Sequence, residues 1–316
     1  MNLRKHVAEH VSQCLQLALL LEVSAYPKPG NVHRTADSPK TRYEHFLAST
    51  VAVAPHFAHA AEVGYDITEG NHTLTEANIG QTIKEAVIST NSWQTDGNTH
   101  LGAIILLAPI AYAAGMVLAA GAFSLNQLRK NIGAIIATTT PEDAVAVYEA
   151  IAIANPGGLG TAPKLDVTAE ASRLQISQQQ IPLSSIFQIA SSYDSIASEW
   201  TNNYPITFDL GYPYFTQRLQ NSHDINTAAV HMFLRILSEI PDTLIIRKVG
   251  RQQARKVSEL ADQVLQSGGL TTLAGRNALH SFDCYLRQRG NKLNPGTTAD
   301  ITSAIIALAI FNGYRP

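Results

Sequence analysis

One stretch constrains the fold more than any other: residues 101–122 contain no charged side chain. Such a run is long enough to cross a bilayer, which requires about 20 consecutive apolar residues. However, this run is rich in alanine and glycine, contains Pro109, has no aromatic belt and stands alone among amphipathic segments. We therefore expect a central helix enclosed by other helices of a soluble protein, and no membrane span.

The remainder of the chain carries repeated helical signals, whereas the alternation typical of strands is nearly absent. Apolar positions in residues 43–61 follow the 3.6-residue period and are followed by Gly64. Thr140 and Pro141 supply an N-cap and a first-turn proline for a helix to about residue 154. Residues 271–289 end in basic side chains, and Asn294-Pro295 is expected to open a last helix that runs to about residue 311. These patterns predict an all-α fold.

Composition narrows the class of protein further. Hydrophobic residues make up 45% of the chain and charged residues 15%, which suits a single multi-helix globular domain over residues 1–316 around the central apolar helix. The formal net charge is -2 and no long basic run occurs, so we expect no nucleic-acid partner.

Only two cysteines occur, Cys14 and Cys284, and they are far apart in the sequence. This usage argues against a disulfide scaffold or a thiolate zinc site and fits a reducing compartment. The apolar run near the N-terminus is interrupted by charged residues and lacks a cleavage signature, so we expect no signal peptide and a cytoplasmic location.

Glycine, proline, asparagine and aspartate gather in four predicted irregular segments: residues 26–37, 91–98, 155–163 and 202–213. In the first, two prolines and Gly30 stiffen the chain around Lys28. A lysine held in this way suits a phosphate group at little entropic cost. The alternative is an ordinary proline-rich turn with a solvated lysine.

Residues 95–100 lead directly into the uncharged helix. A buried helix start presents free N–H groups and a positive dipole end, both of which favour anions. Asn98 and Thr99 lie at that start, and Asp96 and His100 add a candidate metal-ligand or acid/base pair. A simple helix cap would need only one of these polar groups.

The glycine-rich residues 157–160 resemble a phosphate loop only weakly, because no strand precedes them. Asp209 lies between apolar residues, so we expect a cation or a hydrogen-bond donor to meet it. Arg247, Arg251 and Arg255 recur every four residues and predict one basic stripe on a helix, usually a solvated face. Arg247 and Lys248 follow two isoleucines and are therefore the better polyphosphate candidates.

Asp300 lies one turn into the apolar helix that ends the chain. A carboxylate in such surroundings is rarely structural without a partner, so we expect it to act in a site. The histidine pairs His6/His10 and His56/His59, the latter followed by Glu62, have helical spacing for a metal but show no further ligands. Surface histidines of this spacing are common on helices.

Four segments in order, KPGN with a preceding glutamate, NTHLGA, PDTLIIRK and NPGTTAD, resemble the triphosphoribosyl-dephospho-CoA synthase family. The resemblance spans roughly residues 22–311. It implies a helical enzyme that cleaves ATP at ribose C1′, releases adenine and transfers the triphosphoribosyl group to dephospho-CoA or a related cofactor precursor. It also implies ATP as substrate, Mg²⁺ as cofactor and a role in making a prosthetic group.

The resemblance and the chemistry together assign roles to these segments. We expect catalysis from three residues, namely Asp96, His100 and Asp300, with His100 protonating the leaving base. We expect the nucleotide to contact Lys28, Gly30, Asn98, Thr99, Arg247 and Lys248. We expect Mg²⁺ to bind among Glu22, Asp96, Asp209 and Asp300.

Two other readings remain open from the sequence. An N-ribosyl hydrolase, or a ribosyl transferase in another cofactor pathway, would use the same C1′ chemistry. A non-catalytic nucleotide-binding or metal-binding protein would bind ATP without releasing adenine. Small-molecule partners are expected in each case, and a homodimer is compatible with all of them.

Overall fold

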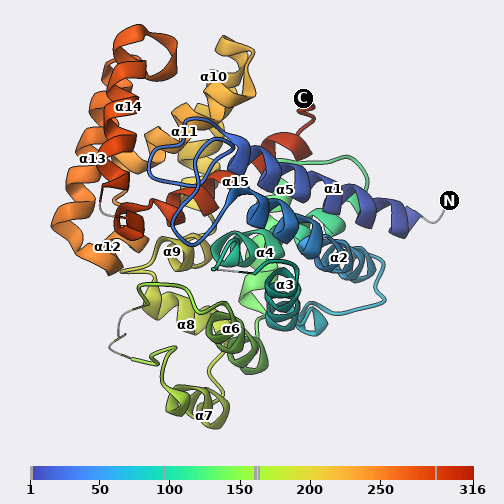
Figure 1. Ribbon diagram of the computed structural model, residues 1–316. Coiled ribbons are helices and arrows are strands. Elements are labelled where there is room, and N and C mark those ends of the chain that lie inside the picture. Colours follow the sequence, from blue (N-terminus) through green and yellow to red (C-terminus); the bar gives the residue numbers. More distant parts are fainter. Residues whose placement is uncertain (1–2, 96, 160–161, 163, 289) are drawn as a thin grey trace.

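The computed structural model describes residues 3–95, 97–159, 162, 164–288 and 290–316. Across these residues the chain forms fifteen α-helices joined by loops and four short helical segments, and it contains no strand (Figure 1). The all-α prediction is therefore confirmed.

The helices of the first half of the chain are α1 (Leu3–Ser24), α2 (Tyr43–Thr68), α3 (Ile79–Trp93), α4 (Leu101–Ala119), α5 (Leu125–Ala137), α6 (Pro141–Ala154) and α7 (Glu170–Gln179). Those of the second half are α8 (Leu183–Ala190), α9 (Ser195–Thr201), α10 (Tyr212–Ser222), α11 (Ile225–Glu239), α12 (Thr243–Val249), α13 (Arg251–Gln266), α14 (Leu273–Arg287) and α15 (Gly296–Phe311). The short segments are Leu74–Glu76, Ile206–Gly211, Gly269–Thr271 and Gly290–Leu293.

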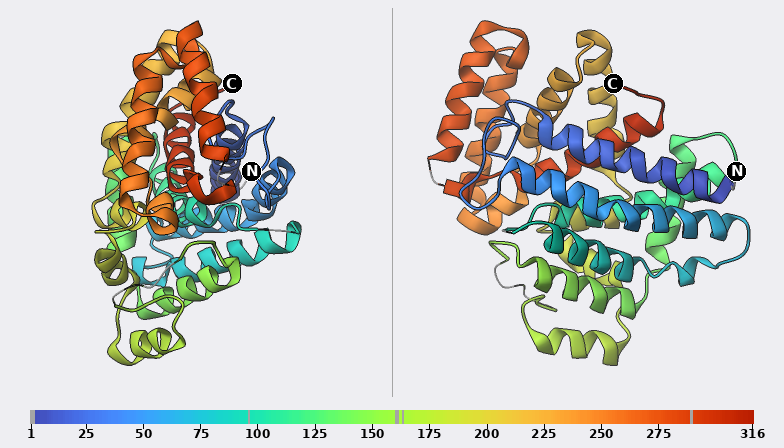
Figure 2. Two further views of the ribbon diagram at one scale, coloured as in Figure 1. Left: turned by 60° about the vertical axis from the view of Figure 1, so that its left-hand side comes forward. Right: turned by 45° about the vertical axis from the view of Figure 1, so that its right-hand side comes forward.

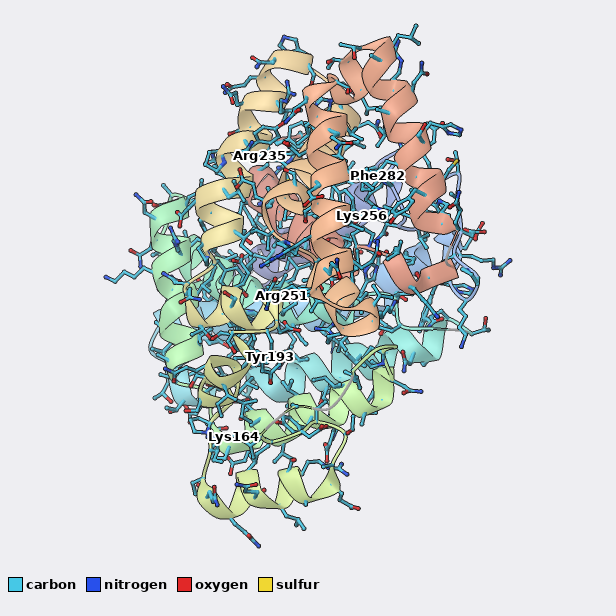
Figure 3. All side chains as sticks on the ribbon, turned by 90° about the vertical axis from the view of Figure 1, so that its left-hand side faces the viewer. Lys164, Tyr193, Arg235, Arg251, Lys256 and Phe282 are labelled. Carbon is cyan, nitrogen blue, oxygen red and sulfur yellow. The ribbon has the colours of Figure 1, made fainter. Side chains whose placement is uncertain are left out.

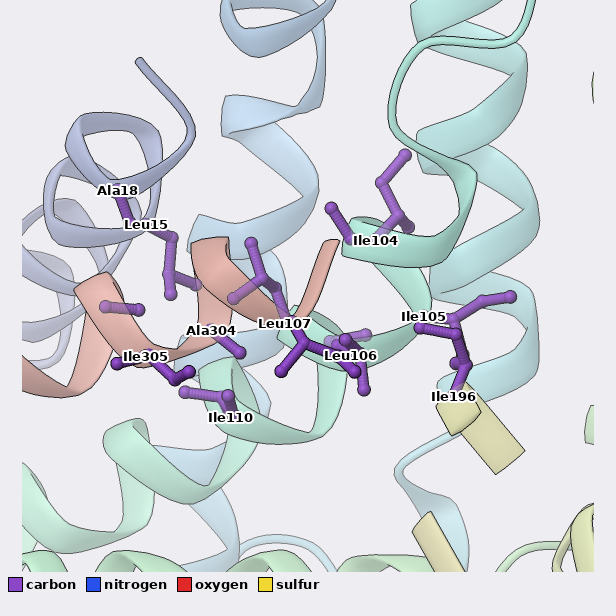
Figure 4. Packing of buried hydrophobic residues seen from close by; sticks show 14 of the residues in the cluster. Leu15, Ala18, Ile104, Ile105, Leu106, Leu107, Ile110, Ile196, Ala304 and Ile305 are labelled. Atoms are coloured by element: carbon purple, nitrogen blue, oxygen red, sulfur yellow. The ribbon is translucent and has the colours of Figure 1, made fainter. Parts of the chain in front are cut away.

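The uncharged helix α4 lies at the centre of the molecule. It is the one helix in the described ranges that is long and apolar enough to cross a membrane, but 83% of its most apolar window is buried by the rest of the chain. It packs against α2, α1, α5 and α15. Figure 4 shows its side chains interleaved with those of α1, α9 and α15, including Ile104, Leu107, Ile110, Leu15, Ile196 and Ile305. The expectation of an enclosed central helix is confirmed.

The crossing of α2 and α4 depends on two glycines. A Cβ atom on Gly64 would lie 2.0 Å from the Tyr112 carbonyl oxygen, and one on Gly115 would lie 2.1 Å from the Ala61 carbonyl oxygen. The backbones therefore approach more closely than side chains would allow. We predicted a helix over residues 43–61 with Gly64 after it, but α2 continues through Gly64 to Thr68 because this glycine serves the crossing.

Two other sequence predictions are wrong. Residues 202–213 are largely helical: Ile206–Gly211 forms a π-helix that runs into α10. The buried Glu199 carboxylate accepts the N–H groups of Ile206 and Thr207 and so stabilises this turn.

The predicted basic stripe is also divided between two helices. Gly250 adopts φ +91° between α12 and α13, a conformation that favours glycine. Arg247 therefore belongs to α12, whereas Arg251 and Arg255 are exposed on α13. Figure 3 shows Arg251 and Lys256 along α13, above Tyr193.

One continuous hydrophobic core joins residues of the described helices from α1 to α15. Around it, α10, α11, α13 and α14 form one end of the molecule, and α6, α7 and α8 form the opposite end (Figures 1 and 2). Helix α15 runs through the middle beside α1 and α4. The start of α15 therefore lies where the two ends meet, close to the start of α4.

Candidate active site

A cavity of about 280 Å³ opens at the meeting point of α1, α4, α9, α12 and α15. Its polar wall is formed by Glu22, Asn31, Thr41, Asn98, Thr99, His100, Asp194, Arg247, Asn291, Asn294, Thr297 and Asp300. Its apolar wall comes from α6, α8, α9 and the loop before α7, and includes Val147, Ile151, Leu159, Val167, Ile186 and Phe187. A largely apolar enclosure with convergent polar groups is typical of small-molecule sites.

Asp300 lies against the first turn of α4. A Cβ atom on Gly102 would lie 2.1 Å from Asp300 Oδ2, so only a glycine leaves room for this carboxylate. The backbone N–H of Ala103, in this first turn, lies close enough to the carboxyl group to lower its pKa. A side chain of the protein itself therefore occupies part of the helix start at which we expected a bound anion.

Several buried carboxylates surround Asp300. Burial, followed by the charges of Glu22 and Asp242, raises the pKa of Asp300 well above its ordinary value. The Ala103 N–H and Lys28 act in the opposite direction but do not outweigh these effects. A cation bound at this wall would favour the ionised form.

Lys28 is fully buried and forms an ion pair with Glu22. Its Nζ also donates to the Glu22 carbonyl oxygen at 3.1 Å. Burial lowers the pKa of Lys28 and raises that of Glu22, while the attraction between the two opposes both shifts. Lys28 is therefore not presented to the cavity as we expected, because a buried ammonium requires a partner and Glu22 supplies it. Glu22 itself does line the cavity.

The segment after Lys28 contacts the C-terminal part of the chain. Asn31 Nδ2 donates to Asn294 Oδ1 at 2.9 Å, and both residues line the cavity. Gly30 has φ +70° and donates its N–H to Asp283 of α14 at 2.7 Å. The structure thus places Gly30 in a turn against α14 and outside the cavity lining.

Asp242 connects the two helices that carry Arg247 and Asp300. Its Oδ1 accepts the N–H groups of Leu244 and Ile245 and caps α12. Its Oδ2 accepts the backbone N–H of Thr298 at 2.8 Å and the Thr298 hydroxyl at 2.9 Å. Because Asp242 is only 2% exposed, these bonds fix α12 against the first turn of α15.

Arg247 reaches the cavity from α12. Its Nη1 forms an ion pair with Asp194 Oδ2, and Asp194 Oδ1 caps α9. The buried Nε of Arg247 has no hydrogen-bond partner among the described residues. Lys248 points differently: its Nζ donates to the Asn291 carbonyl oxygen at 2.8 Å, and its stem lies against Gly158.

The sequence-predicted residues therefore divide into three groups. Those that line the cavity are Glu22, Asn98, Thr99, His100, Arg247 and Asp300. Those that lie immediately behind or beside it are Lys28, Gly30 and Lys248. Asp209 lies away from the cavity and pairs with Arg129 at 2.6 Å, so it does meet the cation that we expected. Asp96 is outside the described residues.

Sequence reasoning missed Asp242, Asp194 and Gly102. The two aspartates each precede a short helix, so their capping role was readable from the sequence. Their second contacts, to Thr298 and Arg247, join segments far apart in the chain and left no local signal.

The histidine pairs give no sign of a metal centre. His56 bonds Ser89 at 2.7 Å, Glu62 pairs with Arg4, and His10 lies beside Cys14. Among the residues that the structure describes, no group of three or more histidine, cysteine, aspartate or glutamate side chains is arranged to hold a metal ion.

All four sequence motifs meet at this cavity through contacts centred on the start of α15. Residues 8–315 also match the family described as ATP:dephospho-CoA triphosphoribosyl transferase. The chain belongs to this family. The resemblance noted from the motifs is thereby confirmed over nearly the whole chain, and the transferases of this family are enzymes that use ATP.

Similar transferases occur in several bacteria. A protein from Pseudomonas fluorescens, provisionally named a 2-(5''-triphosphoribosyl)-3'-dephosphocoenzyme-A synthase, is 26% identical over 96% of this chain and 91% of its own length. A synthase of that name from Klebsiella pneumoniae is 22% identical over 96% of this chain and 91% of its own length. A crystal structure from Archaeoglobus fulgidus, provisionally assigned as a triphosphoribosyl-dephospho-CoA synthase, has a TM-score of 0.65 and 26% identity, and covers 87% of this chain and 100% of that one.

Proposed function

We propose that this protein transfers the triphosphoribosyl group of ATP to dephospho-CoA or a related cofactor precursor and releases adenine. The observation that carries the proposal is the position of Asp300, which fits against the first turn of α4 because Gly102 has no side chain there. This carboxylate faces a cavity lined by all four motif segments. Family membership supplies the reaction class.

The reaction breaks the C1′–N9 bond of ATP and forms a bond from C1′ to an acceptor hydroxyl oxygen. Positive charge builds on the ribose as adenine leaves, so a nearby carboxylate stabilises the transition state. Asp300 and Glu22 are the two carboxylates at this wall that α15 and α1 hold in place. The triphosphate does not react, and its binding energy serves to orient the ribose.

The charges of the cavity support a divalent cation. A triphosphate approaching Glu22 and Asp300 would meet two carboxylates, while Lys28 behind them is already paired. Glu22 Oε1 bonds Lys28, and no donor among the described residues meets its Oε2. We propose that Glu22 and Asp300 hold Mg²⁺, which would neutralise the phosphates there, with water and phosphate oxygens as the other ligands.

The apolar wall suits the other substrate parts. Both ATP and dephospho-CoA carry an adenine ring, and the cavity lining includes Phe187, Tyr148 and Ile186. Aromatic and aliphatic side chains bind planar rings by stacking and by burial of apolar surface. The cavity therefore offers a polar region for the phosphates and an apolar region for a base.

The test is adenine release, followed by chromatography, from ATP and Mg²⁺ with and without dephospho-CoA. We expect release that requires dephospho-CoA, and we expect Asp300→Asn to abolish it while the fold is retained. Release without an acceptor would indicate an N-ribosyl hydrolase. Binding of ATP with no release under either condition would contradict dephospho-CoA as the acceptor and would direct the search to other acceptors or to a binding role.

A further inference from the structure

His100 lies in the wall of the cavity, at the N-cap position of α4. It is only 3% exposed, and its ring packs edge-on against Phe46, with centroids 5.1 Å apart and an interplanar angle of 81°. The imidazole is therefore held in one orientation by α2 on one side and by its own helix on the other.

The hydrogen bonds around Nε2 determine which ring nitrogen carries the proton. Nε2 lies 3.2 Å from the Phe46 carbonyl oxygen and 3.2 Å from Thr50 Oγ1. The Thr50 hydroxyl donates its own proton to the Phe46 carbonyl at 2.8 Å, so it can only accept from the histidine. Because both neighbours accept, Nε2 carries the hydrogen.

Nδ1 therefore carries the lone pair in the neutral ring. No hydrogen-bond partner for Nδ1 occurs among the described residues. Burial is the main cause that lowers the pKa of His100 to about 4, so the ring is neutral near pH 7. A neutral imidazole with this arrangement can receive a proton at Nδ1 but has none to give there.

The proposed reaction requires one group that receives a proton. The attacking hydroxyl of the acceptor must lose its proton as its oxygen bonds to C1′. The departing adenine keeps the electron pair of the C1′–N9 bond and takes up a proton, so the overall reaction consumes and releases none. Solvent water supplies the proton to adenine, because the neutral His100 ring has none to give at Nδ1 and its Nε2–H is held by Phe46 and Thr50.

We propose that His100 is the general base of the transfer, accepting the proton of the attacking acceptor hydroxyl at Nδ1 while Phe46 and Thr50 hold Nε2–H. This inference rests on the proposed transferase function and adds a role to it. It differs from the expectation from sequence, in which His100 protonates the leaving base. The bonds at Nε2, which join α2 to α4, are the reason for the change.

The decisive variant is His100→Gln. The glutamine amide reaches the position of Nε2, so it still donates to Phe46 and Thr50, but it offers no basic atom in place of Nδ1. A structural role would survive this change, whereas loss of a general base lowers kcat by about 10²–10⁴-fold. His56→Gln is the matched control, because His56 bonds Ser89 outside the cavity; it should retain wild-type kcat.

Two further measurements make the outcome decisive even if His100→Gln folds poorly. In His100→Ala, added imidazole should restore part of the transfer rate, because it can occupy the vacated volume and accept the proton. The second measurement is the ¹⁵N spectrum of the protein labelled with ¹⁵N-histidine. The resonances that are present in the wild type and absent in the His100 variant belong to His100, and they should be those of an Nε2–H tautomer.

The results separate this inference from the proposed function. Wild-type protein that fails to release adenine with dephospho-CoA contradicts the proposed reaction with that acceptor. An active wild type whose His100→Gln variant keeps the wild-type kcat would overturn the base assignment alone. An Nδ1–H tautomer in the ¹⁵N spectrum would overturn it equally.

Discussion

Substitution of Gly102 by alanine tests the arrangement of the site most directly. The new Cβ would lie 2.1 Å from Asp300 Oδ2 and 2.7 Å from its Cγ. Ordinary contacts begin near 3.4 Å, so the carboxylate must withdraw by about 1 Å. The backbone of Gly102 is helical and accommodates alanine, so the change acts through the lost space.

The expected effect on catalysis is large, and that on stability is small. Displacement of a catalytic group by about 1 Å can cost on the order of 100-fold in rate. Forcing the buried Asp300 carboxyl group out of its packed position costs about 1–3 kcal/mol of folding free energy. The gain in helix propensity from glycine to alanine, up to about 1 kcal/mol, offsets part of that cost.

The assay combines adenine release at saturating substrates with urea unfolding. We expect kcat to fall about 100-fold and the free energy of unfolding to fall by roughly 1–2 kcal/mol. Gly133→Ala is the matched control, because it lies in the middle of α5 and its Cβ would meet nothing closer than 3.4 Å. It should retain wild-type activity.

A Gly102→Ala variant with wild-type kcat would refute the reasoning. That result would show that Asp300 can move without loss of function, so its position against α4 would not matter for the chemistry. Inactivity of both glycine variants would indicate a general sensitivity of the helices to substitution.

Three other predictions follow from buried groups. Lys28→Met should lower the free energy of unfolding by about 3–5 kcal/mol, because it leaves the Glu22 charge buried without its partner, and adding Glu22→Gln should recover most of that loss in urea titrations. Asp242→Asn should cost about 1–3 kcal/mol by breaking the bonds to Thr298 and should also reduce kcat, whereas unchanged values for both would contradict its connecting role. Burial first, then Arg218, lowers the pKa of His231 to about 4, so its contribution to stability is full above the unfolded pKa near 6.5 and is lost as the pH falls towards 4. His231→Gln should therefore reduce the slope of unfolding free energy against pH by up to about 1.4 kcal/mol per pH unit in that window. An unchanged slope would contradict this prediction.

Local chemistry determined much of the fold. The N-cap Thr140 and the proline after it define the start of α6, which ends at Ala154 as expected. The apolar run of α4 required a place at the centre because no other environment in a folded chain would cover it. These features depend on neighbours within one or two helical turns, so the sequence contains the information needed to predict them.

Glycine was the residue whose role the sequence left most ambiguous. We expected Gly64 to follow a helix and the helix of the basic stripe to run through Gly250, but Gly64 lies inside α2 at a helix crossing and Gly250 separates two helices. The difference lies in the backbone that approaches each glycine. That approach is a property of the packed structure and leaves no local pattern.

The candidate site was predictable as a set of segments and not as a geometry. The motifs containing His100, Arg247 and Asp300 did prove to line one cavity. Composition and capping could not show that Lys28 forms a buried ion pair with Glu22, because the pairing depends on how the loop after α1 folds back.

Residue types and their spacing by themselves determined an all-helical chain with a buried apolar helix and several polar segments able to bind a nucleotide. The tertiary structure alone decided which polar groups remain available: Asp300 faces α4 because Gly102 leaves space, and His100 keeps its lone pair on Nδ1 because α2 places two acceptors at Nε2. The physical reason is that a buried polar group is defined by its partners, and those partners come from segments that only folding brings together.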